Sequence, residues 1–196
     1  MALILPCMSS LREAAVTLFQ TLDRLGIIYA VGGSLASSLH GVARSTQDID
    51  IVIDLHAHRI KGLYEALVSQ FYIDEGAILE AVERGNSFNA IHLESGLKID
   101  FFVASRHPLG SHQLAHRRLA ATPLFGGDPI AVSVISAEDI LLAKLLWYQE
   151  GGNVSERQWN DLLNLVLVQG HRLDRQYLGV QAKRLGVSQL LVRLLS

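Results

Sequence analysis

Two aspartates, Asp48 and Asp50, stand one residue apart at the start of a run rich in β-branched residues, DIDIVIDL. Because side chains alternate between the two faces of a strand, both carboxylates are expected on one face, while Ile49 and Ile51 point into the core. A later run, LKIDFFVA, places Asp100 on the face opposite its apolar residues. If the two strands are neighbours, three carboxylates converge at one site.

Three carboxylates held together without compensation would repel one another, and at least one would take up a proton. A bound cation removes this conflict. Oxygen ligands without a cysteine or a well-placed histidine suit Mg²⁺ or Mn²⁺ better than Zn²⁺. Two such ions about 4 Å apart are a common device for in-line displacement at phosphorus. We therefore expect Asp48, Asp50 and Asp100 to form a site for Mg²⁺ or Mn²⁺.

Gly32, Gly33 and Ser34 follow an apolar run, IIYAV, and precede a segment of helical character, SLASSLHG. A glycine turn that leads into a helix exposes backbone N–H groups, here beside a serine hydroxyl, and such groups bind phosphate oxygens. These three residues are therefore predicted to bind a phosphate-containing ligand. Phosphate and metal would then share one cleft.

The remaining elements follow from hydrophobic periodicity and capping residues. We expect helices over 9–25, 61–70, 77–84 and 112–119, strands over 27–31, 48–55 and 130–135, and a hairpin of 87–94 with 97–104. From Ser136 onward the pattern is almost entirely helical, and SAED is typical of a capping box. The predicted fold class is α/β (α+β), with a small mixed β-sheet flanked by helices over 1–135 and a C-terminal helical bundle over 136–196, packed as one unit, 1–196.

The order of these motifs is a strand, Gly-Gly-Ser, thirteen residues (35–47), Asp-x-Asp on a strand, and a lone Asp on a later strand. This order resembles the DNA polymerase β-like nucleotidyltransferase superfamily. GGSLASSLHGVARSTQDIDIVI is more closely similar to bacterial minimal nucleotidyltransferases, including those related to abortive-infection toxins, with their GG…G..R.T.DID pattern. The segment from SAEDILLAKLLWYQEGG to LDRQYL resembles the helical tail of such proteins.

The resemblance implies a nucleotidyltransferase fold and metal-dependent transfer of a nucleoside monophosphate from an NTP to a hydroxyl or phosphate acceptor. It implies that Asp48 and Asp50 hold the metal ions and that Asp100 completes the site. Gly33 and Ser34 would grip the triphosphate. Two further candidates for phosphate contact are Arg44 and Lys144, the latter in an otherwise apolar helix.

Other interpretations of the same residues fit less well. An EF-hand loop that starts at Asp48 would need glycine at Ile53 and glutamate at Arg59. Paired glycosidase acids stand farther apart and leave the glycine turn unexplained. The P-loop lysine is absent from GGSLASS. A zinc site at His112 and His116 lacks the metalloprotease glutamate and an obvious third ligand. A non-catalytic nucleotide-binding or regulatory partner module with the same fold remains the alternative.

A stretch without acidic residues runs from Phe101 to Gly127 and carries several basic side chains, namely Arg106, His107, His112, His116, Arg117 and Arg118. It is either a solvated basic helix face or a patch that guides an anionic acceptor, such as an RNA end, toward Asp100. The sequence does not choose among RNA, protein and small-molecule acceptors. Trp147 is expected to be a core or dimer-contact residue.

The bulk composition limits the class of protein. Of 196 residues, 49% are hydrophobic and 18% are charged, with a net charge of -2, which is typical of a compact globular domain without a general nucleic-acid coat. No apolar run reaches the ~20 residues of a membrane span. A single cysteine, Cys7, and the lack of a basic segment before the first apolar run favour a cytoplasmic protein. A homodimer or an antitoxin partner is compatible with this composition.

Overall fold

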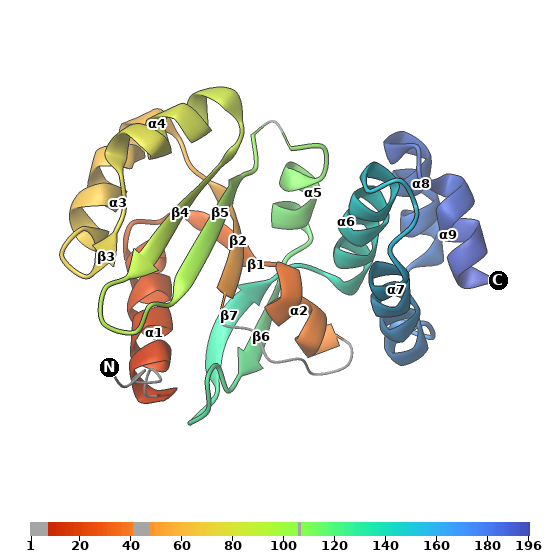
Figure 1. Cartoon of the computed structure of the whole chain (residues 1–196), viewed down its shortest axis with the longest axis horizontal. Helices are drawn as coiled ribbons and strands as arrows, with labels where there is room; N and C mark the ends of the chain where they lie inside the picture. Colours follow the sequence, from red (N-terminus) through yellow and green to blue (C-terminus); the bar gives the residue numbers. More distant parts are fainter. Residues whose placement is uncertain (1–7, 41–47, 106) are drawn as a thin grey trace.

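The computed structural model describes residues 8–40, 48–105 and 107–196. The strands in these residues form one mixed sheet, in the order β3-β4-β5-β2-β1-β7-β6. They are β1 (Ile28–Val31), β2 (Asp48–Asp54), β3 (Phe71–Tyr72), β4 (Ser87–His92), β5 (Lys98–Val103), β6 (Arg118–Thr122) and β7 (Ile130–Val134). Figure 1 shows the sheet at the centre of the molecule, with the C-terminal helices beside it. The predicted fold class is confirmed.

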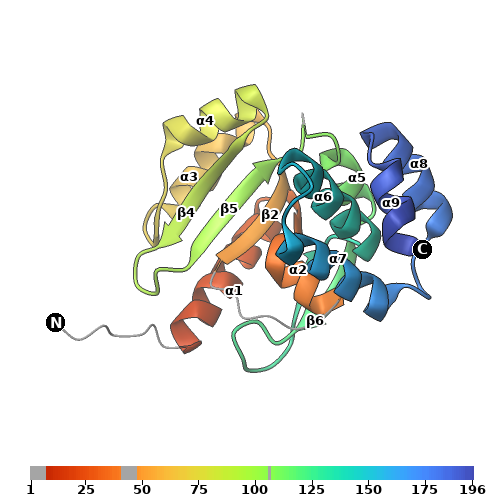
Figure 2. The same cartoon turned by 45° about the vertical axis from the view of Figure 1, so that its right-hand side comes forward.

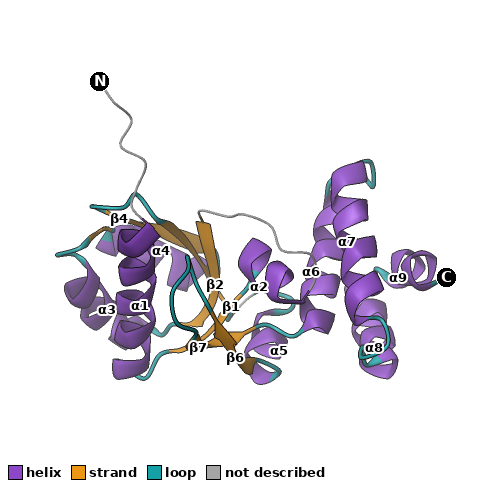
Figure 3. Cartoon of the chain, turned by 90° about the horizontal axis from the view of Figure 1, so that it is seen from below, coloured by secondary structure: helices purple, strands orange, loops and turns teal. Residues whose placement is uncertain are grey.

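The helices lie on both faces of this sheet. They are α1 (Met8–Arg24), α2 (Gly33–His40), the 3-10 helix η1 (Ala57–Arg59), α3 (Ile60–Leu67), α4 (Glu75–Arg84), α5 (Gly110–Ala115), α6 (Ala137–Glu150), α7 (Glu156–Gln169), α8 (Arg175–Leu185) and α9 (Ser188–Leu195). In Figure 3, α1, α3 and α4 lie on one side of the sheet, and α2 and α5, with α6 to α9 beyond them, lie on the other.

Local sequence explains where the principal helices begin and end. The buried residues of α1 recur at helical spacing, and the chain leaves the helix through Gly26, which has φ +60°. Ser136 caps α6, because its hydroxyl accepts the N–H of Asp139 at 3.1 Å. The capping box predicted at SAED is therefore present in its serine half.

Strands β2 and β5 are parallel neighbours, and their register fixes the relation between the two acidic motifs. Asp50 pairs with Asp100, and Asp48 pairs with Lys98. On the opposite face of the same strands, Ile49 and Phe101 are fully buried. The predicted alternation is confirmed, and so is the predicted hairpin, since β4 pairs antiparallel with β5.

One predicted helix is wrong in its second half. The sequence predicts a helix over 112–119, but α5 ends at Ala115 and β6 begins at Arg118. In β6, Leu119, Ala120 and Ala121 pair antiparallel with β7. These residues favour helix in isolation, and hydrogen bonding to β7 outweighs that preference. The two-residue strand β3 is a further element that the sequence pattern does not predict.

The C-terminal helices stand against the α2 side of the sheet, as Figure 2 shows. Both α6 and α7 contact α2. The side-chain amide of Gln169, at the end of α7, donates to the carbonyl oxygen of His40, at the end of α2, at 2.7 Å. Within the described ranges, no helix is long and apolar enough to cross a membrane.

Candidate active site

Asp48, Asp50 and Asp100, which we call the carboxylate edge, lie near the beginnings of β2 and β5. The parallel register sets Asp50 beside Asp100, as the sequence predicted for neighbouring strands. Asp48 is exposed, whereas Asp50 and Asp100 are partly buried. The three predicted metal ligands therefore come from one edge of the sheet, but only two of them are sheltered from solvent.

The closeness of the three carboxylates has its clearest effect on the pKa of Asp50. Burial raises the pKa of its carboxyl, and the nearby carboxylates of Asp100 and, more weakly, Asp48 raise it further. The backbone N–H of Ser34 and the ammonium of Lys98 act in the opposite direction. Repulsion among the carboxylates, which the sequence predicted, is present in the structure and is only partly relieved by the protein itself.

The Gly32-Gly33 turn is built around Asp50. The N–H of Gly32 donates to the backbone oxygen of Asp50 at 2.8 Å. Gly33 has φ +54°, and a Cβ at this position would lie 1.7 Å from Asp50 Oδ2. Both the backbone conformation and the space require glycine here. The turn and Asp50 are thus in direct contact, and the backbone N–H of Ser34 donates to the Asp50 carboxylate.

Lys98 is a component of the site that the motifs alone do not reveal. Its Nζ donates to Asp100 Oδ2 at 2.7 Å. Because Lys98 stands two residues before Asp100 on the same strand, alternation alone could have placed both side chains on one face. The ammonium partly neutralises the third carboxylate.

No set of three or more His, Cys, Asp or Glu side chains in residues 8–40, 48–105 and 107–196 is arranged to hold a metal ion. The carboxylate edge is therefore not a preassembled metal cage. Its chemistry nevertheless fits a hard cation, because the donors are carboxylate oxygens and Asp50 is destabilised by its negative neighbours. The residues present are compatible with Mg²⁺ or Mn²⁺ if Asp100 exchanges its contact with Lys98 for the metal.

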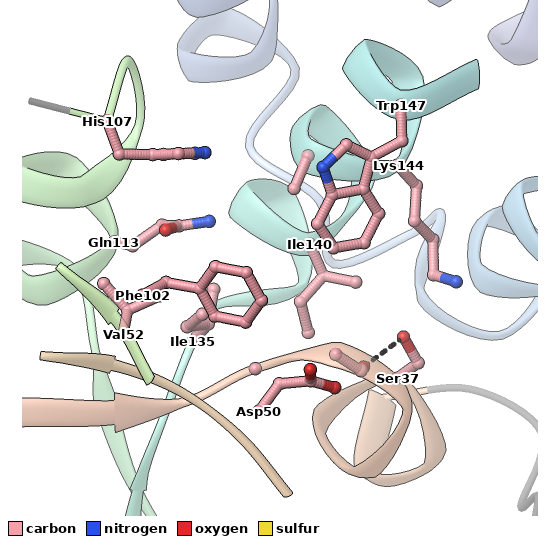
Figure 4. Close-up of a pocket in the computed structure, with 13 residues that line it drawn as sticks. Ser37, Asp50, Val52, Phe102, His107, Gln113, Ile135, Ile140, Lys144 and Trp147 are labelled. Carbon is pink, nitrogen blue, oxygen red and sulfur yellow. Dashed lines mark hydrogen bonds between the residues drawn. The ribbon is translucent and has the colours of Figure 1, made fainter. Parts of the chain in front are cut away.

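A small cleft of about 40 Å³ lies between this edge and α6. Figure 4 shows side chains from the sheet, α2, α5 and α6 facing it. It is lined by Gly32, Gly33, Ser37, Asp50, Val52, Phe102, His107, Gln113, Ile135, Ile140, Ala143, Lys144 and Trp147. Of the predicted site residues, Gly32, Gly33, Asp50 and Lys144 line it. Ser37, one helical turn beyond Gly33, lines it in place of Ser34.

Lys144 reaches the cleft, but its charge is already paired. Its Nζ lies 3.3 Å from Asp161 Oδ2 on α7. Trp147, three residues farther along α6, shares its face of the helix. Trp147 is not a core residue, since it is 44% exposed and lines the cleft. Its other predicted role, as a dimer-contact residue, stays a prediction.

The basic residues of the stretch 101–127 lie in different surroundings, and Arg117 and Arg118 are exposed. His107 lines the cleft. His116 stacks edge-on against Tyr177 of α8, and His112 contacts Arg184 of the same helix. Two of its basic residues therefore join α5 to the C-terminal helices. Arg106, like the predicted phosphate contact Arg44, lies outside the described residues.

His107 is held in a defined protonation state. Leu109 donates its backbone N–H to His107 Nδ1 at 3.2 Å, so the neutral ring carries its proton on Nε2. Burial lowers the pKa of the imidazole, and Glu150 opposes this shift weakly. The ring therefore presents an N–H donor toward the cleft (Figure 4).

Comparison with solved structures identifies the fold. An antigenic nucleotidyltransferase-like protein from Paracoccidioides brasiliensis matches 94% of this chain and 91% of its own at 20% identity, with a TM-score of 0.54. ANT(2'')-Ia in complex with adenylyl-2''-tobramycin matches 90% and 97% at 14% identity, with a TM-score of 0.55. A Thermotoga maritima protein matches 78% and 94% at 16% identity, with a TM-score of 0.52.

Neither protein-family profiles nor curated protein sequences match this chain. At these identities, structural similarity establishes architecture rather than substrate. The chain has the nucleotidyltransferase fold.

Proposed function

We propose that this protein transfers a nucleoside monophosphate from an NTP to a hydroxyl or phosphate acceptor and releases pyrophosphate, with Mg²⁺ or Mn²⁺ as cofactor. The observation that carries the proposal is the placement of Asp50. It is in register with Asp100 and in contact with the glycine turn at the start of α2. A metal-binding edge and a phosphate-binding helix terminus meet at this one residue.

The proposed roles follow from position. Asp48, Asp50 and Asp100 hold the metal, which when bound neutralises charge on the triphosphate. The backbone amide of Gly33, the hydroxyl of Ser37 and, once it leaves the Asp50 carboxylate, the backbone amide of Ser34 would face phosphate oxygens. In the structure the Ser37 hydroxyl donates to the carbonyl oxygen of Gly33 at 2.8 Å, and rotation about its Cα–Cβ bond would release it.

Lys144 is proposed to contact the triphosphate by leaving Asp161. The side chains of Lys144 and Asp161 are 17% and 33% exposed, so the ion pair is partly buried. An incoming phosphate offers the ammonium a more highly charged partner than one carboxylate. The proposed contact between Arg44 and phosphate rests on the sequence pattern alone.

The experiment that tests this function is isothermal titration of ATP, GTP, CTP and UTP, with and without Mg²⁺. Wild type should bind at least one NTP only when the metal is present. Asp50→Asn should weaken that binding about a hundredfold or more, because the central ligand is lost. Asp54→Asn is the matched control, as it makes the same change at the other end of β2. Absence of metal-dependent NTP binding by wild type would refute the proposal.

Transfer is tested separately, with NTPs labelled at the α or the γ phosphorus and incubated with protein and cell extract. Nucleotidyl transfer moves the α label into the acceptor and leaves the γ label in pyrophosphate. Labelled RNA, protein or small molecules would identify the acceptor class. The matched ANT(2'')-Ia complex contains an adenylylated small molecule, which makes small molecules one acceptor class to include. Transfer of the γ label would contradict the reaction.

The alternative function is a non-catalytic nucleotide-binding or regulatory partner module. The contact between Lys98 and Asp100 favours it, because a side-chain ammonium stands where the third carboxylate would meet a metal. In this case NTP binds but no α label leaves it in any extract. An unaltered, bound NTP recovered after incubation would therefore support the module over the enzyme.

The narrower resemblance, to minimal nucleotidyltransferases related to abortive-infection toxins, remains part of the proposal. It depends on the pattern from Gly32 to Asp50, of which residues 41–47 lie outside the described residues. It suggests a bacterial, cytoplasmic protein with an antitoxin partner or a second copy as its companion. Light scattering of the purified chain, alone and with the product of a neighbouring gene, tests this companion.

A further inference from the structure

The cleft beside the carboxylate edge is too small for the ligand proposed for it. Its volume of about 40 Å³ is little more than the ~30 Å³ that one molecule occupies in liquid water. Pockets that enclose small-molecule ligands measure ~300–1,000 Å³. Gly33, Asp50 and Lys144 all line this cleft. A nucleotide can therefore contact the three residues together only after a side chain has left the space between them.

The side chain that occupies this space is Phe102. Figure 4 shows its ring extending from β5 into the cleft, toward Ile140 and Trp147 of α6. Phe102 stands two residues after Asp100 on the same strand, so both side chains lie on one face of the sheet. It is partly buried, whereas Phe101 and Val103 on the opposite face belong to the core. The ring thus lies next to the carboxylate edge, where an NTP would need room.

A second hollow borders the same ring on the side of β4. It has a volume of about 400 Å³ and is lined by Gly85, Asn86, Ser87, Phe102, Val103 and His107. In the sheet register, Phe102 stands between Val52 on β2 and Ser87 on β4. Because the exposed serine is small, the space above β4 stays open. The larger free volume is therefore beside the ring and not in the cleft that the ring occupies.

The rim of this hollow is fixed by backbone hydrogen bonds. Helix α4 ends at Gly85, which has φ +69° and donates its N–H to the carbonyl oxygen of Ala81 at 2.8 Å. The carbonyl oxygen of Asn86 accepts the N–H of Val103 at 3.0 Å and so joins the rim to the end of β5. The Phe102 side chain is the part that can move, because rotation about its Cα–Cβ bond takes the ring to another staggered rotamer.

We propose that Phe102 is a gate. Its ring lies in the cleft, as in this structure, and turns over Ser87 into the hollow when an NTP enters. This inference rests on the proposed function, because that function places the triphosphate at Gly33 and the carboxylate edge. It adds that the protein keeps its own site closed with one aromatic ring. The measured NTP affinity is then the affinity of the open site, reduced by the fraction of molecules in which the ring is out.

The test compares the rate constants of NTP association and dissociation, with Mg²⁺ present, in wild type and Phe102→Ala. Stopped-flow fluorescence of Trp147 reports binding, and both proteins carry Trp159→Phe so that Trp147 is their one tryptophan. Phe102→Ala should speed association about tenfold and tighten binding by the same factor, because nearly every molecule is then open. Dissociation should stay unchanged.

Tyr72→Ala is the matched control. Tyr72 pairs with Ile91, which pairs with Lys98 of β5, so its aromatic ring lies on the same face of the sheet as Phe102. It is not among the described residues that line the cleft, and its removal should leave both rate constants unchanged. Should Phe102→Ala fail to fold, Phe102→Leu removes the ring but keeps an apolar side chain, and it should also speed association.

A second measurement reports on the ring without any nucleotide. Acrylamide quenching of Trp147 fluorescence should be stronger in Phe102→Ala than in wild type, by about twofold, because the ring no longer contacts the space in front of the indole. Tyr72→Ala should be quenched like wild type.

The outcomes separate the gate from the proposed function. Equal association rate constants in wild type and Phe102→Ala would overturn the gate and leave the function standing. Faster dissociation with unchanged association would also overturn it, because the ring would then be a contact surface for the ligand. If neither protein binds any NTP, the proposed function fails, and the quenching result alone decides whether the ring closes the cleft.

Discussion

Two carboxylates with raised pKa values, one partly buried and one fully buried, occupy different parts of this molecule. Asp50 belongs to the carboxylate edge, where the nearest charged groups include Asp100 and Asp48. Asp139 lies where α6 meets α8, is fully buried, and accepts hydrogen bonds from the hydroxyls of Tyr177 at 2.6 Å and Ser136 at 3.1 Å. We call Ser136, Asp139 and Tyr177, with His116, the α6–α8 junction.

The two regions differ in the groups that surround the carboxylate, which are hydrogen-bond donors in one region and further negative charges in the other. At the junction, hydroxyls and the imidazole of His116 favour the ion, and only burial raises the pKa of Asp139. At the edge, burial and like charge act together on Asp50. A buried carboxylate with complementary partners stabilises a helix contact, whereas one beside further carboxylates retains a need for a cation. A raised pKa alone therefore does not identify a functional site.

The largest expected effect tests how closely the glycine turn approaches Asp50. Gly33→Ala should lower the free energy of unfolding by about 3 kcal/mol or more, because a left-handed alanine and an overpacked contact both cost energy. Urea denaturation measures this change. Gly96→Ala is the control, since Gly96 also has positive φ, at +68°, but nothing lies within 4 Å of its added Cβ. Equal destabilisation of the two variants would show that Asp50 does not press on the turn.

The α6–α8 junction should respond next. Tyr177→Phe removes a donor from a buried carboxylate and should cost about 1–3 kcal/mol of unfolding free energy. Tyr72→Phe, at a side chain that is 67% exposed, should stay within about 0.5 kcal/mol of wild type. Nucleotide binding should survive in both variants. Loss of NTP binding in Tyr177→Phe would mean that the junction positions the site as well as the helices.

A smaller effect is expected when Lys98 is replaced, and this variant tests whether negative charge at the carboxylate edge attracts a cation. Lys98→Met removes the ammonium beside Asp100 and should raise Mg²⁺ affinity about fivefold in the presence of NTP, because the edge becomes more negative. Lys61→Met, which breaks an exposed pair with Glu65 on α3, is the control. Calorimetric titration with Mg²⁺ measures both. An unchanged affinity after Lys98→Met would place the metal away from Asp100.

The smallest expected effect is a pH dependence at the junction. The pKa of Asp139 is raised in the folded state, so its contribution to stability is fully present below the ordinary value of 3.8 and is lost as pH rises through the folded pKa. Asp139→Asn removes this loss. From pH 4 to pH 8 the stability of wild type should therefore fall relative to that of the variant.

His116 Nδ1 lies 3.9 Å from Asp139 Oδ2, so a charge on the imidazole would interact with the carboxylate. Denaturation midpoints are therefore compared in a His116→Gln background, with and without Asp139→Asn, so that the charge of the imidazole does not contribute. A difference between these two proteins that stays constant across pH would show that burial does not shift the carboxyl of Asp139.

The elements that could be predicted are those whose pattern is local. Alternation in DIDIVIDL and LKIDFFVA placed the aspartates and the buried isoleucines on opposite faces, and the glycine stop of α1 and the serine cap of α6 were visible in the sequence. β6 could not be predicted in this way. Its alanines favour helix, and only pairing with β7, farther along the chain, makes them a strand.

By itself, the sequence determined that two carboxylates share a face of one strand, that a third lies on another, and that a glycine turn precedes them, because these relations depend on backbone periodicity. Only the tertiary structure set Asp50 beside Asp100, paired Lys144 with Asp161, and brought Gln113, Phe102 and Trp147 to one cleft. These contacts join residues from different elements, and their partners are fixed by strand register and helix packing rather than by spacing along the chain.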